Sequence, residues 1–241
     1  MALNNPYNTR LVRTETAAGA GAQLLLLVSL GTAVGLGPAG WLTGLAFAGA
    51  TWAVLTRALA RSWLVSFGAA NRVTLARATL VGGVTALVAD SFASSPPVTV
   101  LVVLTAVALI LDAVDGQVAR RTGTTSALGA RFDMEVDAVL ILVLSVYVAT
   151  SLGPWVLLIG AMRYAFVAAS WVLPWLAGPL PPSTARKTVA ALQGVLLLVV
   201  GADVLPRPLA VGAALLALTL LSWSFARDIG RLWHTRDRRV R

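Results

Sequence analysis

The chain has 241 residues, of which 58% are hydrophobic and 12% are charged, and its formal net charge at pH 7 is +9. An ordinary soluble domain is about 25% charged, so this composition cannot supply the polar coat of a water-facing fold. The chain holds no cysteine and a single histidine, His234. These counts exclude disulfide scaffolds, cysteine zinc sites and thiol catalysis, and they disfavour histidine-ligated metals and Ser-His-Asp triads. Any catalytic or metal-binding site must therefore consist mainly of carboxylates and arginines.

Eight apolar blocks, separated by short breaks rich in Gly, Pro, Ser and Arg, predict an all-α polytopic transmembrane helical bundle. In chain order we expect spans near residues 17–36, 41–58, 73–89, 98–119, 136–152, 155–175, 188–204 and 209–226. The first block follows Arg10 and Arg13 and has the pattern of a signal peptide. The short break from Gly37 to Gly40, followed at once by a second span, instead favours a retained helical hairpin.

The distribution of positive charge predicts the orientation of these spans, because short cytoplasmic loops retain Lys and Arg. With the N-terminus inside, all of the 19 basic residues except Arg163 and Arg207 fall on the cytoplasmic side. We therefore expect a multi-pass integral membrane protein with both termini in the cytoplasm and its basic face against anionic membrane lipids. Nucleic acid is not expected as a partner, because no soluble basic domain exists to carry it. The basic stretch from Arg227 onward is interpreted as a solvated anchor.

Half of the ten acidic residues fall between positions 112 and 137. Asp112 and Asp115, spaced i and i+3 at the end of the fourth predicted span, share one helical face. Asp133 and Asp137, spaced i and i+4, share a face at the start of the fifth. A Thr-Gly-Thr-Thr-Ser segment with the composition of a turn lies between them. We therefore expect the two helices to return antiparallel, with four carboxylates at one membrane depth.

Such a cluster needs compensation, since two carboxylates about 4 Å apart repel by about 4 kcal/mol at an effective dielectric constant of about 20. A divalent cation supplies it, and oxygen ligands without His or Cys select Mg²⁺ or Mn²⁺ rather than zinc. A site with two divalent ions that grips a diphosphate suits this ligand set best. The plainer alternative is that the aspartates form interfacial ion pairs with Arg120, Arg121 and Arg131.

Small residues accompany the acidic ones and would let a bulky ligand approach the backbone. The full pattern is Asp112, two residues, Asp115, Gly116, two residues, Ala119, Arg120, eight residues, Gly129, three residues, Asp133, three residues, Asp137. At every signature position this pattern resembles the CDP-alcohol phosphotransferase family, which makes phospholipids inside membranes. The run from Asn71 to Arg77, Asn-Arg-Val-Thr-Leu-Ala-Arg, is a looser match to the opening of the family's first core helix.

The resemblance implies a six-helix catalytic core, which we place at residues 63–228. Residues 1–62 would form an N-terminal tail and two extra spans, and residues 229–241 a basic cytoplasmic tail. The implied reaction transfers a phosphatidyl-type group from a CDP-linked lipid, with CDP-diacylglycerol the expected donor, to an alcohol acceptor. CMP would leave in a metal-assisted single displacement at a cytoplasmic active site, in a homodimer.

The resemblance also implies roles for individual residues. The implied metal ligands are Asp112, Asp115, Asp133 and Asp137, and Asp137, last in the motif, would also be the base that receives the acceptor proton. The implied donor site consists of Asn71, Thr74, Arg77, Gly116, Ala119, Arg120 and Gly129.

Three basic residues later in the chain are candidates for the acceptor site. Arg163 lies inside the sixth predicted span, and an ionisable group at membrane depth is by default a functional candidate. Arg186 and Lys187 open the seventh span, where anchoring by the positive-inside rule explains them equally well. Together the three would suit a phosphorylated alcohol such as inositol phosphate or glycerol phosphate.

Two other functions stay open at this point. An intramembrane prenyltransferase also binds a lipid diphosphate through paired Asp motifs and Mg²⁺, but it would carry a longer Asp-rich run where this chain has Gly116 and Ala119. A carboxylate-lined ion transporter would spread its acidic groups along a path or in repeated halves. Here the acidic groups cluster once.

Overall fold

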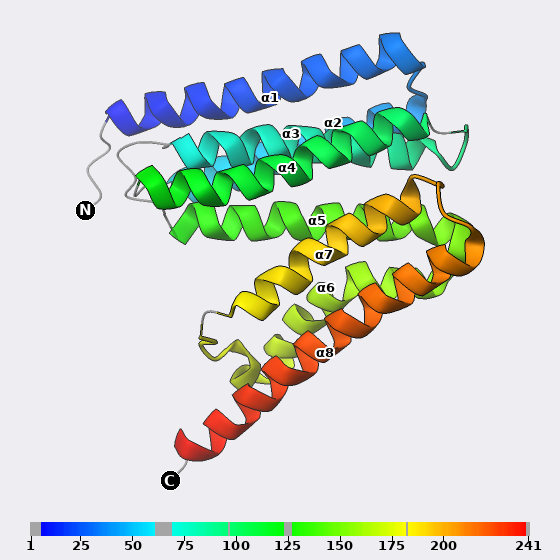
Figure 1. Ribbon diagram of the computed structural model, residues 1–241. Helices are drawn as coiled ribbons and strands as arrows, with labels where there is room; N and C mark the ends of the chain where they lie inside the picture. The colour runs from blue at the N-terminus through cyan, green and yellow to red at the C-terminus, as the bar shows by residue number, and fades with distance from the viewer. Residues whose placement is uncertain (1–5, 61–68, 96, 123–126, 182, 240–241) are drawn as a thin grey trace. The chain divides into compact units, whose positions relative to one another are not determined.

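The computed structural model describes residues 6–60, 69–95, 97–122, 127–181 and 183–239, with side chains described over 17–57, 72–95, 97–114, 129–181 and 183–234. The described chain folds into eight α-helices and two short 3-10 helices, η1 (Pro154–Val156) and η2 (Pro174–Ala177), and contains no strand (Figure 1). This confirms the predicted all-α architecture. The α-helices are α1 (Pro6–Val34), α2 (Pro38–Ala60), α3 (Ala69–Asp90), α4 (Val98–Thr122), α5 (Ala127–Leu152), α6 (Leu157–Val172), α7 (Thr184–Gly201) and α8 (Arg207–Arg239).

Seven helices of the described chain are long and apolar enough to cross a membrane, which agrees with a multi-pass integral membrane protein. In α4, which runs to Thr122, the side chains are described only from Val98 to Val114, and this part holds fewer than the 18 residues that each of the other seven spans reaches. The eighth predicted span therefore stays a prediction. Large apolar side chains such as Leu25, Leu42 and Trp171 are exposed, as expected of residues that face lipid.

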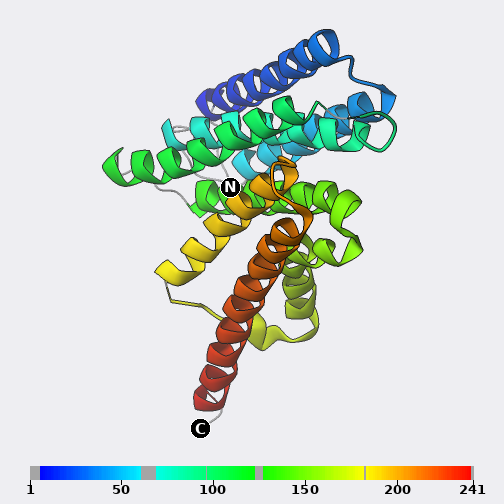
Figure 2. The ribbon, with the colours of Figure 1, turned by 45° about the vertical axis from the view of Figure 1, so that its right-hand side comes forward.

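The chain divides into two compact units, Met1–Leu140 and Ile141–Arg241, and α5 passes from one into the other. In the first unit α3 is the central helix, because it packs against α1, α2 and α4. Its span is 67% buried, the largest share of any candidate span in the described chain. Figures 1 and 2 both show α2, α3 and α4 running side by side. Residues on α3 are therefore placed to meet side chains from several neighbouring helices.

Small residues let α1 approach α3 closely. A Cβ added at Gly19 would lie 2.8 Å from a methyl carbon of Leu75, and one added at Gly83 would lie 2.8 Å from a methyl carbon of Leu26. Small residues are typical of helix interfaces in membranes. The break between α1 and α2 spans residues 35–37, earlier than the predicted break from Gly37 to Gly40, because Pro38 already begins α2. Gly35 in this break has φ +73°, a conformation that glycine adopts without strain.

In the second unit α7 and α6 pack against α8. The Nε2 group of Gln193 on α7 donates a 3.0 Å hydrogen bond to the backbone carbonyl of Ala217 on α8. Gln193 is 1% exposed, so this bond satisfies one of the hydrogen-bonding groups of a buried amide. The start of α7 is capped by Ser183, whose hydroxyl accepts from the backbone N–H of Arg186.

Helix α8 is longer than the sequence predicts. The eighth span is expected at residues 209–226 with a solvated tail after it, whereas α8 continues to Arg239. Two contacts explain the difference: Asp228 and Leu232 are buried, and the rings of Trp233 and Trp175 meet edge to face at 5.3 Å. The segment that looks like a tail because it is rich in arginine therefore has a face that packs against η2.

Candidate active site

Three aspartates from two helices come together in the first unit. Asp112 lies on α4, and Asp133 and Asp137 lie one turn apart near the start of α5. One carboxylate oxygen of each lies within 4.8 Å of those of the other two. All three residues are half-buried, so their oxygens stay accessible to a ligand. The convergence expected from the i, i+4 spacing and the helical return is observed for these three residues.

The guanidinium of Arg77 joins the three carboxylates. Arg77 lies on α3 and is 0% exposed. Its Nη1 atom is 2.9 Å from Oδ1 of Asp112 and also donates to Oδ1 of Asp133, while Nη2 donates to Oδ1 of Asp137. The planar fork of an arginine is suited to several carboxylates at once. We call these four residues the aspartate-arginine cluster.

The aspartate-arginine cluster carries a net negative charge. At 4.8 Å and an effective dielectric constant of about 20, two carboxylates repel by about 3.5 kcal/mol. Arg77 offsets part of this repulsion, but three ionised carboxylates and one guanidinium still sum to a formal charge of −2. The available donor atoms are carboxylate oxygens, which are ligands of hard divalent cations such as Mg²⁺ and Mn²⁺. The residues present therefore fit a divalent metal.

Several predicted site residues lie outside the part of the chain whose side chains are described. The backbone of each is helical, in α3 or α4; these residues are Asn71, Asp115, Gly116, Ala119 and Arg120. Thr74 is buried one turn before Arg77 on α3, and Gly129 lies one turn before Asp133 on α5. The alternative of interfacial ion pairs named Arg120, Arg121 and Arg131. Among the residues whose side chains are described, Arg77 forms ion pairs with all three aspartates, whereas Arg120 and Arg121 lie outside those residues.

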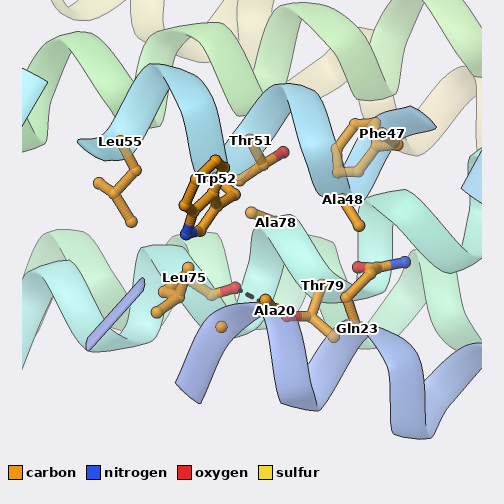
Figure 3. A pocket seen from close by; sticks show the side chains of 11 residues that line it. Ala20, Gln23, Phe47, Ala48, Thr51, Trp52, Leu55, Leu75, Ala78 and Thr79 are labelled. Atoms are coloured by element: carbon orange, nitrogen blue, oxygen red, sulfur yellow. Dashed lines mark hydrogen bonds between the residues drawn. The ribbon is translucent and has the colours of Figure 1, made fainter. Parts of the chain in front are cut away.

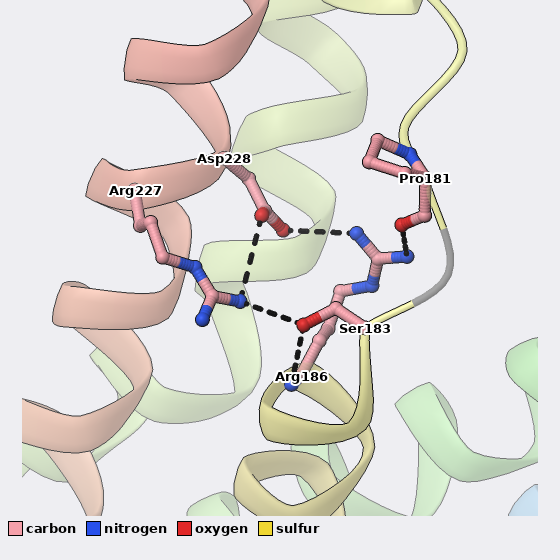
Figure 4. Close-up of polar contacts among 5 residues, drawn as sticks. All are labelled: Pro181, Ser183, Arg186, Arg227 and Asp228. Atoms are coloured by element: carbon pink, nitrogen blue, oxygen red, sulfur yellow. Dashed lines mark hydrogen bonds and ion pairs between the residues drawn. The ribbon is translucent and has the colours of Figure 1, made fainter.

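The predicted acceptor residues all lie in the second unit. Arg163 is half-buried on α6, and Arg186 and Lys187 lie in the first turn of α7. Lys187 is exposed, whereas Arg186 is partly buried and held by other groups. Its Nη1 donates to Oδ2 of Asp228 at 3.2 Å, and its Nη2 donates to the carbonyl of Pro181 at 3.2 Å (Figure 4).

The same network includes two residues that the sequence analysis did not assign to a site. Asp228, on α8, is 5% exposed and lies between Arg186 and Arg227, whose Nη2 is 3.8 Å from Oδ1 of Asp228 (Figure 4). Ser183 accepts a 3.1 Å hydrogen bond from Nη2 of Arg227. In the sequence, Asp228 is visible only as a single acidic residue beside Arg227 at the end of an apolar span. That pattern does not distinguish a solvated carboxylate from a paired one. Asp228 fixes the direction in which Arg186 extends.

Comparison with known proteins gives one match. A family model described as CDP-alcohol phosphatidyltransferase matches residues 67–225, about two thirds of the chain. The matched region begins just before α3 and ends within α8, so α1 and α2 lie outside it. No curated protein and no solved structure matched the chain.

Proposed function

The chain belongs to the CDP-alcohol phosphatidyltransferase family, and from this membership we propose that it transfers a phosphatidyl group from CDP-diacylglycerol to a phosphorylated alcohol and releases CMP. The observation that carries the proposal is the aspartate-arginine cluster, in which Asp112, Asp133 and Asp137 offer oxygens within 4.8 Å of one another. This set matches the needs of a diphosphate substrate, whose own negative charge must be neutralised before a nucleophile can approach.

Asp112, Asp133 and Asp137 would hold the metal, with Asp115 as a fourth ligand. A bound Mg²⁺ or Mn²⁺ would neutralise the bridging diphosphate and stabilise the charge that develops as CMP leaves. Two such ions are proposed, because four ionised carboxylates and Arg77 sum to a formal charge of −3, which one divalent ion does not neutralise. Arg77 holds the three carboxylates together from α3, and we propose that its charge also contributes to binding the donor phosphates.

The proposed transfer is a single displacement. The acceptor hydroxyl oxygen forms a bond to the phosphorus that carries the diacylglycerol, and the bond from that phosphorus to the CMP oxygen breaks, with its electron pair leaving on CMP. Asp137 accepts the hydroxyl proton as the new bond forms. Because Asp137 lies one turn beyond Asp133 on α5, it would share in holding the metal while accepting the proton of the acceptor.

The remaining predicted residues have roles in substrate binding. Asn71, Thr74, Gly116, Ala119, Arg120 and Gly129 would line the path of the cytidine and diphosphate. Arg163, Arg186 and Lys187 would hold the acceptor phosphate, and within the second unit Arg186 is bound by Asp228. We place the active site and both termini on the cytoplasmic side, and we propose a homodimer. Family membership favours this transfer over the prenyltransferase and transporter alternatives.

The full-length protein in detergent, supplied with CDP-diacylglycerol and Mg²⁺, tests this function against a panel of alcohols. The panel pairs inositol phosphate and glycerol phosphate with inositol and glycerol, and mass spectrometry identifies the product. We expect CMP and a phosphatidyl product in equal amounts with one phosphorylated alcohol, and loss of both with Asp133→Asn. The matched control is Asp90→Asn, at the far end of α3. CMP release from none of the alcohols, or full activity of Asp133→Asn, would contradict the proposal.

A further inference from the structure

The cavity between α1, α2 and α3 is too small for a substrate. It is lined mainly by apolar side chains, among them Phe47, Trp52 and Leu75 (Figure 3). Its volume is about 20 Å³, which leaves room for about one water molecule. A phosphorylated alcohol does not fit there, so its recognition depends on side chains elsewhere in the chain. The predicted acceptor residues all lie in the second unit.

Arg186 of the second unit is held at two points near the start of α7. Its Nη1 donates to Oδ2 of Asp228 at 3.2 Å, and its Nη2 donates to the backbone carbonyl of Pro181 at 3.2 Å (Figure 4). A guanidinium has more N–H donors than these two bonds use. The Arg186 side chain is 37% exposed, so a ligand can still reach it. Arg186 is therefore fixed in direction while it keeps donors for a ligand.

The groups around Arg186 give this region a charge that suits a phosphate. Lys187 is exposed beside it at the start of α7. Arg227 of α8 donates from Nη2 to the hydroxyl of Ser183 at 3.1 Å, and the same Nη2 lies 3.8 Å from Oδ1 of Asp228. The three cations and this carboxylate sum to a formal charge of +2. A phosphate monoester carries a charge of about −1.5 to −2 at pH 7, so the two charges match.

Asp228 is too deeply buried to meet a ligand itself. It is 5% exposed and lies between Arg186 and Arg227. Any effect of Asp228 on a ligand must therefore pass through these arginines. We propose that Asp228 is a positioning residue, which holds the Arg186 guanidinium in place before the acceptor phosphate binds. This role rests on the function proposed above, which assigns Arg186 to the acceptor.

Removal of the Asp228 charge has two opposite effects on phosphate binding. The region becomes more positive, which by itself strengthens the attraction of a phosphate. The guanidinium of Arg186 also loses a charge-assisted hydrogen bond and must be ordered again when phosphate binds, which weakens the affinity about two- to tenfold. Because Arg186 is 37% exposed, water and salt screen the first effect. We therefore expect weaker binding, and this sign separates positioning from a change of charge.

Protection of Arg186 by inorganic phosphate measures this effect without turnover. The full-length protein in detergent, with a chelator present, is treated with phenylglyoxal, which modifies accessible arginines. Peptide mass spectrometry follows the modification of Arg186 at rising phosphate concentrations. We expect phosphate to protect Arg186 saturably and not to protect Arg57, an exposed arginine on α2.

Variants of Asp228 assign the protection to its carboxylate. Asp228→Asn should need about two- to tenfold more phosphate than the wild type for half-protection of Arg186. Asp228→Glu, which keeps the charge but shifts the carboxylate, should need more phosphate than the wild type and less than Asp228→Asn. The matched control is Asp203→Asn, at an exposed acid between α7 and α8 with φ 55°. Asparagine also adopts this conformation, so the control should match the wild type.

Kinetic measurements with the phosphorylated alcohol that the enzyme accepts test whether Asp228 acts through Arg186. Asp228→Asn should raise the KM for this alcohol and leave kcat and the KM for CDP-diacylglycerol unchanged. A general loss of folding would not give this split. In an Arg186→Gln background, Asp228→Asn should raise the KM no further.

Three results would each overturn the proposal. The first is a wild type whose Arg186 is not protected by phosphate. The second is half-protection at the same or a lower phosphate concentration in Asp228→Asn, which with a lower melting temperature would leave Asp228 a structural role only. The third is a further rise of KM in the Arg186→Gln background. Absence of CMP release with every alcohol would contradict the proposed function alone, because the protection assay needs no turnover.

Discussion

Replacement of Arg77 by methionine tests how the aspartate-arginine cluster is held together. The substitution keeps an unbranched side chain on α3 but removes the charge that contacts all three carboxylates. Each carboxylate pair, with oxygens within 4.8 Å of one another, then repels by at least about 3.5 kcal/mol at an effective dielectric constant of about 20. Removal of one partner of a buried ion pair typically costs about 3–5 kcal/mol. Because the three aspartates are about one third exposed, water screens part of this, and we expect a loss near the lower end, about 3 kcal/mol.

Thermal unfolding in detergent, scanned at a fixed rate with a chelator present, measures this loss. For a chain of this size about 1 kcal/mol corresponds to about 2–4 °C, so Arg77→Met should melt about 6–12 °C below the wild type. A divalent cation can replace the lost charge. At Mg²⁺ concentrations about 100 times its Kd the stabilisation is about 2.7 kcal/mol, which would restore most of the melting temperature.

The wild type should gain less from Mg²⁺, because Arg77 already neutralises part of the cluster. The control is Arg57→Met, an exposed arginine at the end of α2, which should change neither the melting temperature nor its dependence on Mg²⁺. If Arg77→Met were as stable as the wild type in chelator, Arg77 would not offset the repulsion between the carboxylates. A wild type that gains as much from Mg²⁺ as the variant does would lead to the same conclusion.

Three further predictions concern the reaction and the topology. Asp137→Asn should still bind CDP-diacylglycerol in the presence of metal while kcat falls about 10²- to 10⁴-fold; near-normal turnover would remove Asp137 as the base. Arg163→Ala should raise the KM for the phosphorylated acceptor about tenfold to a hundredfold, and an unchanged KM with weaker donor binding would contradict its role. In intact cells an impermeant thiol reagent should label a cysteine at Ser94 and not one at Arg239, since both termini are predicted to be cytoplasmic; labelling at 239 would reverse the topology.

The acidic half of the candidate site could be predicted because it depends on local geometry. The spacing of Asp133 and Asp137 places both on one helical face, and a short turn is enough to bring Asp112 from the preceding helix to the same depth. The region matched by the family model, residues 67–225, contains these three aspartates. The all-α architecture was equally accessible, since long apolar blocks in a membrane protein leave few alternatives to helices.

The residues that depend on tertiary packing could not be predicted in the same way. Arg77 was named as a donor residue, but its contact with Asp133 crosses 56 positions in sequence and depends on how α3 is rotated against α5. Asp228 follows Arg227 in a basic stretch, and only the packing of α8 shows that it is buried beside Arg186. The sequence shows Gln23 as a polar residue in an apolar span, and only the packing of α1 against α3 shows that its Nε2 has no hydrogen-bond partner among the described residues.

We propose that the aspartates of α4 and α5 hold a divalent metal against the diphosphate of the donor. Mn²⁺ bound to the full-length protein with CDP-diacylglycerol allows a direct measurement, because electron-nuclear double resonance detects ³¹P nuclei coupled to the metal. We predict a ³¹P coupling that appears on addition of the donor and is lost in Asp112→Asn and Asp133→Asn, but not in Asp90→Asn. Mn²⁺ that binds without a ³¹P coupling would show that the metal does not contact the donor diphosphate. A coupling that persists in both site variants would show that these aspartates do not hold the metal.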